Sequence, residues 1–119
     1  MDLKRHFTHY DVRADVRRFA QDVVSRFGGS WNTYKDHPEG MNLDATSVDH
    51  WGNRGRGHPL LEHEGDAMVA YILGQTMFRP IRWLIWWGWI WTPKDGWLPY
   101  NGWQGLHKDR DAHVHVTYY

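Results

Sequence analysis

The sequence predicts an α+β fold in which two main helices pack on a small antiparallel sheet. Apolar residues recur at helical spacing in two segments of the chain, and the later part is rich in aromatic and β-branched residues with strand-like alternation. The chain has 119 residues, no internal repeat and no low-complexity linker. We therefore expect a single domain covering residues 1–119, with one modest core.

Two helices are expected in the segments with a spacing of three and four. The first spans residues 11–27 and stops at Gly28-Gly29, and its apolar stripe consists of Val12, Val16, Phe19, Val23 and Phe27. The second runs from about residue 62 to 76, with acidic residues at its N-terminal end. Its expected buried stripe consists of Ala67, Met68, Tyr71 and Ile72.

The expected strands lie after Pro80. Residues 82–92 form one aromatic and β-branched run, which suits a central strand that is apolar on both faces. The sequence PKDG at 93–96 predicts a turn, so a short strand near 97–100 would complete a hairpin. The alternating HVHVTYY at the end predicts another strand, whereas 35–61 and 101–112 are expected to be loops.

Composition excludes several classes of partner and site. Lys plus Arg and Asp plus Glu both number 14, which gives no overall attraction to nucleic acid or to an anionic membrane. Cysteine is absent, so histidine and the carboxylates are the available strong metal ligands. The first residues contain no apolar signal region, and the longest apolar run is far below the roughly 20 residues of a spanning helix. We expect a soluble protein without its own export signal.

Two histidine motifs suggest a metal site when they are taken together. In a strand, His113 and His115 point to the same face, and the two intervening valines point to the core. His37 and Asp44 add an imidazole and a carboxylate, and Gly40 between them allows the chain to fold back. Each motif alone is consistent with a solvated surface. Together they match the nitrogen and oxygen ligands that zinc prefers.

These motifs resemble a known enzyme superfamily. A His-x6-Asp pair followed by His-x-His resembles the D-alanyl-D-alanine carboxypeptidase and hedgehog-like zinc peptidase superfamily, in particular a branch found in actinobacterial cell-wall proteins and phage lysins. The resemblance covers about residues 31–119. The matching pieces, in order, are HPEGMNLD, GDAMVAYIL, LIWWGWIWTPKDGWLPY and HVHVTYY.

The resemblance implies a zinc ion bound by His37, Asp44 and His115, with the zinc site on the open face of the sheet. His113 would lie beside it as a base or as a transition-state partner. The family usually carries a carboxylate directly before the first histidine of the His-x-His pair. This chain has Ala112 there and Asp111 one residue earlier, which leaves the identity of the general base open.

The expected function is that of a zinc-dependent metallopeptidase, a hydrolase that cuts peptide bonds of bacterial peptidoglycan. A zinc ion with two imidazoles and one carboxylate lowers the pKa of bound water to about 7 and polarises a carbonyl. The protein would act at the bacterial cell wall, as a phage endolysin or as part of a larger protein, and we expect a monomer. The alternative is a non-catalytic wall-binding module that retains this fold and holds glycan in an aromatic groove.

Other residues have a competing interpretation. His50 and His58, with Asp49 beside the first, form a rival ligand set that ranks below the first one. The Gly-rich loop between them is more easily explained as a rim that contacts a carboxylate-bearing substrate through Arg54 and Arg56. Most of the nine tryptophans are expected in the core. Candidate substrate-binding rings are Trp97, Tyr100 and Trp103.

Overall fold

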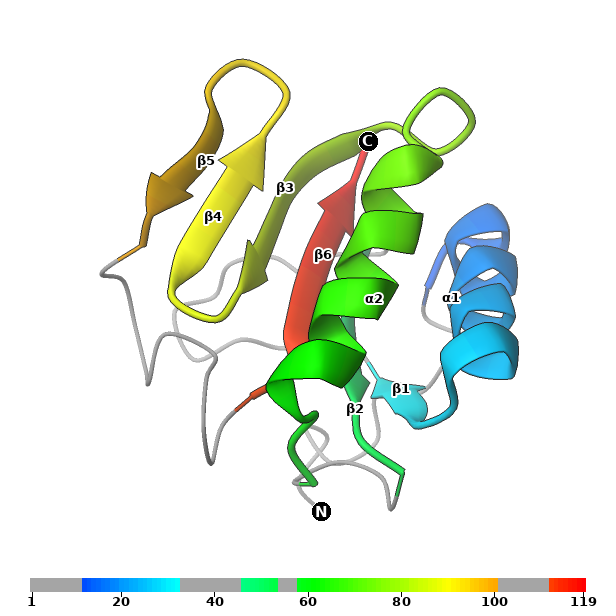
Figure 1. The fold of residues 1–119 in the computed structure, drawn as a ribbon. Coiled ribbons are helices and arrows are strands. Elements are labelled where there is room, and N and C mark those ends of the chain that lie inside the picture. The colour runs from blue at the N-terminus through cyan, green and yellow to red at the C-terminus, as the bar shows by residue number, and fades with distance from the viewer. Residues whose placement is uncertain (1–11, 33–45, 54–57, 101–111) are drawn as a thin grey trace, which may run out of the picture.

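A computed structural model describes residues 12–32, 46–53, 58–100 and 112–119 of the chain. The described residues form an α+β structure, as predicted, with two helices on one face of a six-stranded antiparallel sheet (Figure 1). The strand order is β1-β2-β6-β3-β4-β5. The elements are α1 (Ala14–Phe27), β1 (Ser30–Asn32), β2 (Ser47–Trp51), α2 (Glu62–Gly74), β3 (Ile81–Trp86), β4 (Trp89–Thr92), β5 (Gly96–Pro99) and β6 (Val114–Tyr118).

Helix α1 ends where the sequence predicts, but it begins at Ala14 rather than at residue 11, and Phe27 of the expected stripe is exposed. Gly28 has a φ of 82° and its N–H donates to Val24 O at 2.7 Å, so a residue without a side chain closes the last turn. The buried face consists of Val16, Phe19, Ala20 and Val23. The hydroxyl of Tyr71 on α2 donates to Asp22 Oδ2 at 2.5 Å, which ties the two helices together.

Helix α2 is confirmed over most of the predicted range, but its buried stripe is rotated. It buries Gly65, Met68, Val69 and Ile72, whereas Ala67, which was expected in the stripe, is exposed. Gly65 explains the rotation. A Cβ at this position would lie 2.0 Å from the ring of Trp86 on β3, so the helix presents its glycine to the indole. Two elements approach more closely here than a side chain would allow.

The prediction of one strand over 82–92 is wrong, because Trp87 and Gly88 form a turn. Both residues have positive φ, 54° and 84°, as in the two-residue turns that join twisted antiparallel strands. The chain therefore reverses, and β3 and β4 pair with Trp86 opposite Trp89. Trp89 and Trp91 consequently share the helix side of the sheet with Leu84 and Trp86, whereas one continuous strand would place them on the same face as Trp83. The PKDG turn and the following strand are confirmed as the β4–β5 hairpin.

The prediction of loop over 35–61 is also wrong in part, because β2 lies in this range. β2 pairs with β1 on one side and with β6 on the other, so it is an interior strand. Its sequence, SVDHW, has an apolar residue on each face and polar residues on each face. Local alternation of this kind gives no strand signal, and the position of β2 in the sheet is decided by its neighbours.

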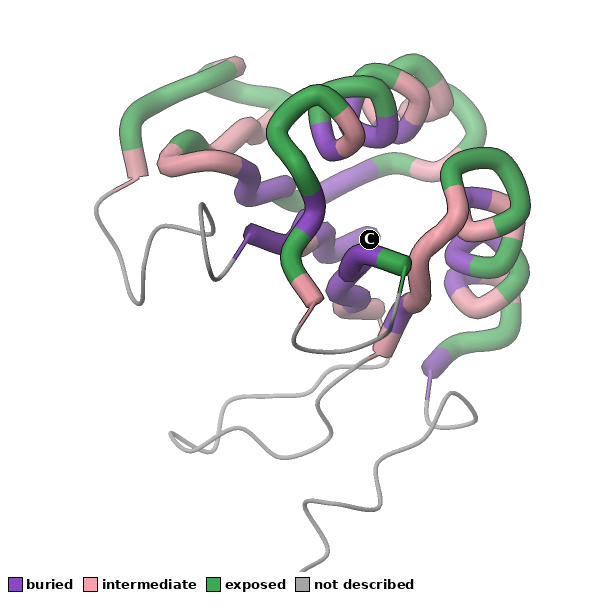
Figure 2. Tube along the Cα trace, turned by 60° about the horizontal axis from the view of Figure 1, so that its bottom comes forward, coloured by how far each residue is buried: buried purple, intermediate pink, exposed green. Residues whose placement is uncertain are grey.

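The core lies where the helices meet the centre of the sheet (Figure 2). Val114 and Val116 are fully buried there, as predicted from the alternation in β6. His113, His115 and Thr117 alternate with them and therefore lie on the opposite face of the sheet. Among the described residues, no helix combines the length and the apolar character needed to cross a membrane.

Candidate functional site

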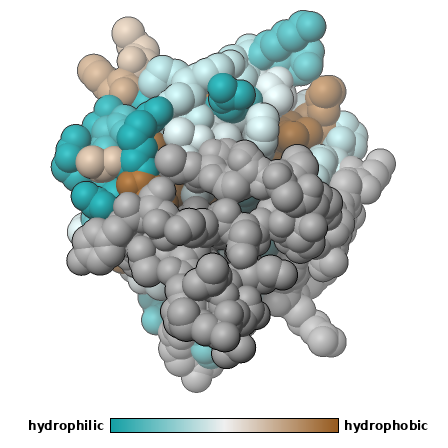
Figure 3. Space-filling view, turned by 180° about the vertical axis from the view of Figure 1, so that it is seen from behind, coloured by the Kyte–Doolittle hydropathy of each residue, from teal (hydrophilic) through white to brown (hydrophobic). Residues whose placement is uncertain are grey.

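A polar cluster lies on the sheet face opposite the helices, which we call the open face. It consists of Asp49 on β2 together with His113, His115 and Thr117 of the C-terminal segment. Asp49 and His115 are direct partners across the antiparallel ladder, and such partners point to the same side. In a view of this side, the visible described residues are mostly hydrophilic, with hydrophobic side chains in separate spots (Figure 3).

Hydrogen bonds fix the ring of His115 at both nitrogens. Nδ1 lies 2.7 Å from Asp49 Oδ1, and Nε2 lies 3.2 Å from Thr117 Oγ1. A carboxylate accepts hydrogen bonds, so Nδ1 carries a proton, and in the neutral ring Nε2 accepts from the hydroxyl of Thr117. The hydroxyl of Thr117 is also 2.9 Å from Ser47 Oγ, which continues the network to the start of β2. His115 therefore has a defined tautomer and a defined orientation.

Packing fixes the second imidazole. The ring of His113 stacks on the indole of Trp51, with centroids 4.2 Å apart and planes 20° apart. Trp51 is itself oriented, because its Nε1–H donates to Asn32 Oδ1 at 3.1 Å. His113 Nε2 lies 3.8 Å from Asp49 Oδ1, so both imidazoles face the same carboxylate oxygen. The sequence prediction that the two histidines share a face is confirmed.

The burial of this cluster favours strong electrostatic interactions. The side chain of Asp49 is 6% exposed, that of His113 is 10% exposed and that of His115 is 25% exposed. A carboxylate in such a position interacts strongly with the imidazoles that face it, because little water screens the interaction. The arrangement suits proton transfer through an imidazole, or the binding of a cation by His115 through Nε2.

The other predicted site residues are divided between two regions. His37, Asp44, Arg54, Arg56, Trp103 and Asp111 lie outside the described residues. Trp97 is on β5, on the helix side of the sheet, and Tyr100 follows that strand with its N–H bonded to Gly88 O. The structure therefore does not bring Trp97 to the open face. Within the described ranges, no group of three His, Asp or Glu side chains is arranged to hold a metal ion.

His50, the first member of the rival ligand set, is a core residue. It is 0% exposed and pairs with Val114, which places it on the helix face of β2, opposite to Asp49. Neither ring nitrogen has a hydrogen-bond partner among the described residues. Burial lowers the pKa of His50 to about 4, while the neighbouring Asp49 partly opposes this shift. The imidazole is therefore neutral near pH 7.

The sequence analysis grouped Asp49 with His50, whereas the structure places Asp49 beside His113 and His115. Neighbouring residues of a strand point to opposite faces, so Asp49 and His50 are separated once β2 is known to be a strand. The sequence does not identify the partner of Asp49, because His115 is 66 residues away. Only the pairing of β2 with β6 brings the two residues together.

No family model, curated protein or solved structure matches the chain. The resemblance to the zinc peptidase superfamily thus rests on the sequence motifs.

Proposed function

We propose that the protein is a zinc-dependent peptidase that hydrolyses peptide bonds of bacterial peptidoglycan. The observation that carries the proposal is the Asp49–His115 hydrogen bond of 2.7 Å on the open face, with His113 beside the same carboxylate. Metal-binding histidines in proteins commonly donate their second ring N–H to a carboxylate, which fixes the tautomer and strengthens the ligand. With Nδ1 bonded to Asp49, zinc would bind at Nε2, where it would replace the contact with the hydroxyl of Thr117.

The remaining ligands would be His37 and Asp44, and the connectivity of the chain supports this set. Asn32, the last residue of β1, pairs with Asp49, and Ser47, the first residue of β2, pairs with Thr117. Asp44 is three positions before Ser47, and three residues of chain span at most about 10 Å. Two imidazoles and one carboxylate suit catalytic zinc, which supplies a positive charge that polarises a carbonyl and acidifies water.

The other residues of the cluster have distinct proposed roles. His113 is the proton acceptor, or the group that stabilises negative charge on the carbonyl oxygen, since an imidazole nitrogen can accept a proton and a ring N–H can donate a hydrogen bond. Asp49 holds His115 and faces His113, so it positions both rings. Trp51 keeps the ring of His113 from rotating away, because the two rings are stacked. Peptidoglycan as the substrate follows from the resemblance to cell-wall peptidases and lysins.

One observation favours the non-catalytic alternative. Ala112, which occupies the position of the family's carboxylate, is 0% exposed and belongs to the hydrophobic core. No carboxylate is therefore offered from that position. A wall-binding module of this fold would bind purified peptidoglycan without releasing new amino groups, and this outcome separates it from the peptidase.

The test measures zinc content and peptide hydrolysis in the same preparation. We expect about one zinc per chain after purification with zinc and without chelator, and new free amino groups from purified peptidoglycan. His115→Ala should lose both. The matched control is His63→Ala, because His63 is an exposed histidine on α2. Absence of zinc from the wild type, or retention of zinc and turnover in His115→Ala, would contradict the proposal. His50→Ala is unsuitable as a control, since it would leave a cavity in the core.

A further inference from the structure

A groove of tryptophans lies on the helix side of the sheet, where β4 and β5 extend beyond α2 (Figure 1). It has a volume of about 350 Å³, and we call it the tryptophan groove. Its lining consists of Trp86, Trp87, Trp89, Trp97, Glu62 and Asp66. His113 and His115 are on the opposite face of the sheet, so the groove is separate from the proposed peptidase site and its test does not depend on that function.

The strand turn and the helix together build the groove. Because the chain reverses at Trp87 and Gly88, Trp89 returns beside Trp86 on the helix side. Trp97 reaches the same side from β5, where it pairs with Trp91. Two of these indoles are well exposed, Trp89 at 46% and Trp97 at 41%. Large aromatic side chains that remain exposed around a hollow are typical of a binding surface.

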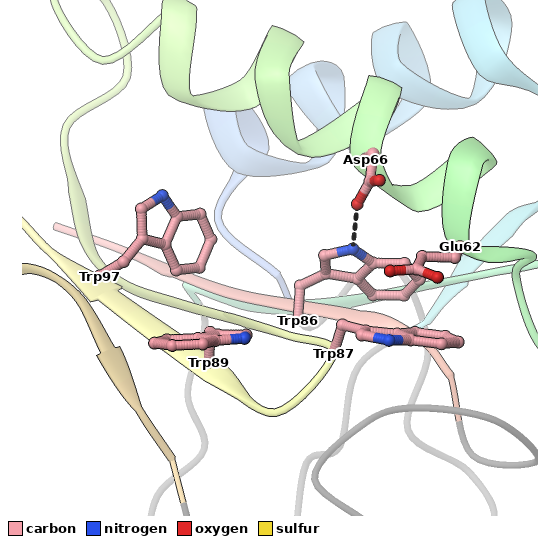
Figure 4. A pocket seen from close by; sticks show the side chains of 6 residues that line it. All are labelled: Glu62, Asp66, Trp86, Trp87, Trp89 and Trp97. Atoms are coloured by element: carbon pink, nitrogen blue, oxygen red, sulfur yellow. Dashed lines mark hydrogen bonds between the residues drawn. The ribbon is translucent and has the colours of Figure 1, made fainter.

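The indole rings border the groove from different sides. In Figure 4, Trp87 and Trp89 are seen edge-on and form a floor, whereas Trp97 is seen face-on and stands across it. Trp86 is drawn between Asp66 and Trp87, with its plane tilted by 45° to that of Trp87 at a centroid distance of 5.3 Å. Trp97 stands across the floor formed by Trp87 and Trp89, so the three rings do not form one continuous flat platform for an extended sugar chain. Rings that face one space from different sides suit a compact group.

The charge of the groove is negative. Glu62 and Asp66 lie above the floor on the first turns of α2 (Figure 4), and none of the lining residues is basic. Asp66 is held in place because the Nε1–H of Trp86 donates to its Oδ1 at 2.9 Å. Its Oδ2 has no hydrogen-bond partner among the described residues, and neither does the carboxylate of Glu62. Both side chains are exposed and line the groove.

We propose that the tryptophan groove binds an alkylammonium group. The faces of the indole rings carry negative electrostatic potential and attract a cation, and the two carboxylates add a direct charge interaction. Both attractions act on the same ligand charge, and no described lining group would repel it. An anion meets repulsion from both carboxylates, and a neutral group of the same shape gains only the contact with the rings.

The first test compares two ligands that have the same shape and differ in charge. Choline and 3,3-dimethylbutanol are titrated separately into the purified protein, and binding is followed by the NMR signals of the indole N–H groups and by calorimetry. We expect choline to bind at least about tenfold more tightly and to weaken as salt is raised. Equal affinities, tighter binding of 3,3-dimethylbutanol or no binding of choline would overturn the proposal. So would tighter binding of a chitin oligosaccharide, which would identify a glycan site.

The second test uses variants with matched controls. Asp66→Asn keeps an acceptor for the N–H of Trp86 but removes the charge, and we expect it to weaken choline binding about tenfold. Trp89→Ala, at an exposed position, should have a similar effect. The control for charge is Asp95→Asn in the β4–β5 turn, and the control for the indole is Trp83→Ala on the opposite face, where Trp83 pairs with Thr117. Controls that lose as much affinity as the groove variants would overturn the assignment.

Discussion

Different interactions position the candidate functional residues on the two faces of the sheet. On the open face, hydrogen bonds and one ring stack fix two imidazoles around Asp49, and the cluster is mostly buried. On the helix face, the indoles of the tryptophan groove are positioned by strand pairing and by the close approach of α2. The cluster around Asp49 should therefore be sensitive to the loss of one charge, whereas the tryptophan groove should be sensitive to changes in side-chain volume. Substitutions of the two kinds should separate the faces.

The largest expected effect is the loss of turnover on the open face in His113→Ala. Proton transfer or oxyanion stabilisation by such a group contributes roughly 10²–10⁴ in rate. We expect hydrolysis of peptidoglycan peptides to fall by at least about a hundredfold, with zinc content and fold unchanged, because His113 is not an assigned ligand. Turnover is measured as new free amino groups at matched zinc occupancy. Asp111→Ala should cost less, and unchanged turnover in His113→Ala would remove its catalytic role.

The second prediction concerns the helix face of β2 and the stability of the fold at low pH. Because burial lowers the pKa of His50 to about 4 from an ordinary value of 6.5, the unfolded chain binds a proton that the folded chain does not between these values. The free energy of unfolding is therefore not reduced by His50 above pH 6.5, and it is reduced progressively as pH falls toward 4. The total loss is about 3 kcal/mol.

Urea unfolding of the wild type and of His50→Leu at a series of pH values measures this loss. The difference in unfolding free energy between the two proteins should change between pH 6.5 and 4, and stay constant above pH 7. His63→Leu, at an exposed histidine, is the control and should follow the wild type. If the unfolding free energies of the wild type and of His50→Leu change in parallel over the whole pH range, His50 does not titrate in this way.

The third prediction returns to the open face and tests the role of Asp49. Asp49→Asn keeps an acceptor for the Nδ1–H of His115 but removes the negative charge. Substitution of such a carboxylate typically costs 10–100-fold in metal affinity, and we expect a loss of about this size. Competition with a chromophoric chelator measures the zinc affinity. Asp95→Asn is the charge control, and an affinity of Asp49→Asn equal to that of the control would mean that Asp49 does not support the ligand.

The smallest expected effect is on packing between α2 and β3. In Gly65→Ala the new methyl would lie 2.0 Å from the ring of Trp86, so the helix or the indole must move. Overpacking of this kind costs about 1–3 kcal/mol, and the bond from Trp86 to Asp66 should be disturbed. Gly74→Ala is the control, since a Cβ there meets nothing within 4 Å. Thermal unfolding should show a lower midpoint for Gly65→Ala alone, and equal midpoints would contradict the close approach.

Local sequence patterns determined the elements that have strong periodicity or turn chemistry. The spacing of Val16, Phe19 and Val23 predicted α1, and Gly28 predicted its end, because a helix and its cap depend on residues within a few positions. The alternation in HVHV similarly placed both histidines on one face and Val114 and Val116 in the core. These features are confirmed, since the physical cause of each is contained in the segment itself.

Tertiary structure decided what depends on distant partners. The run 82–92 contains only one glycine, and pairing of β3 with β4 makes the chain turn at Trp87 and Gly88 and creates the tryptophan groove. Asp49 becomes the partner of His115 only because β2 lies beside β6 in one register, and a shift by one residue would present His50 to the open face instead. Register is set by the packing of both faces of the sheet at once, which no single segment encodes.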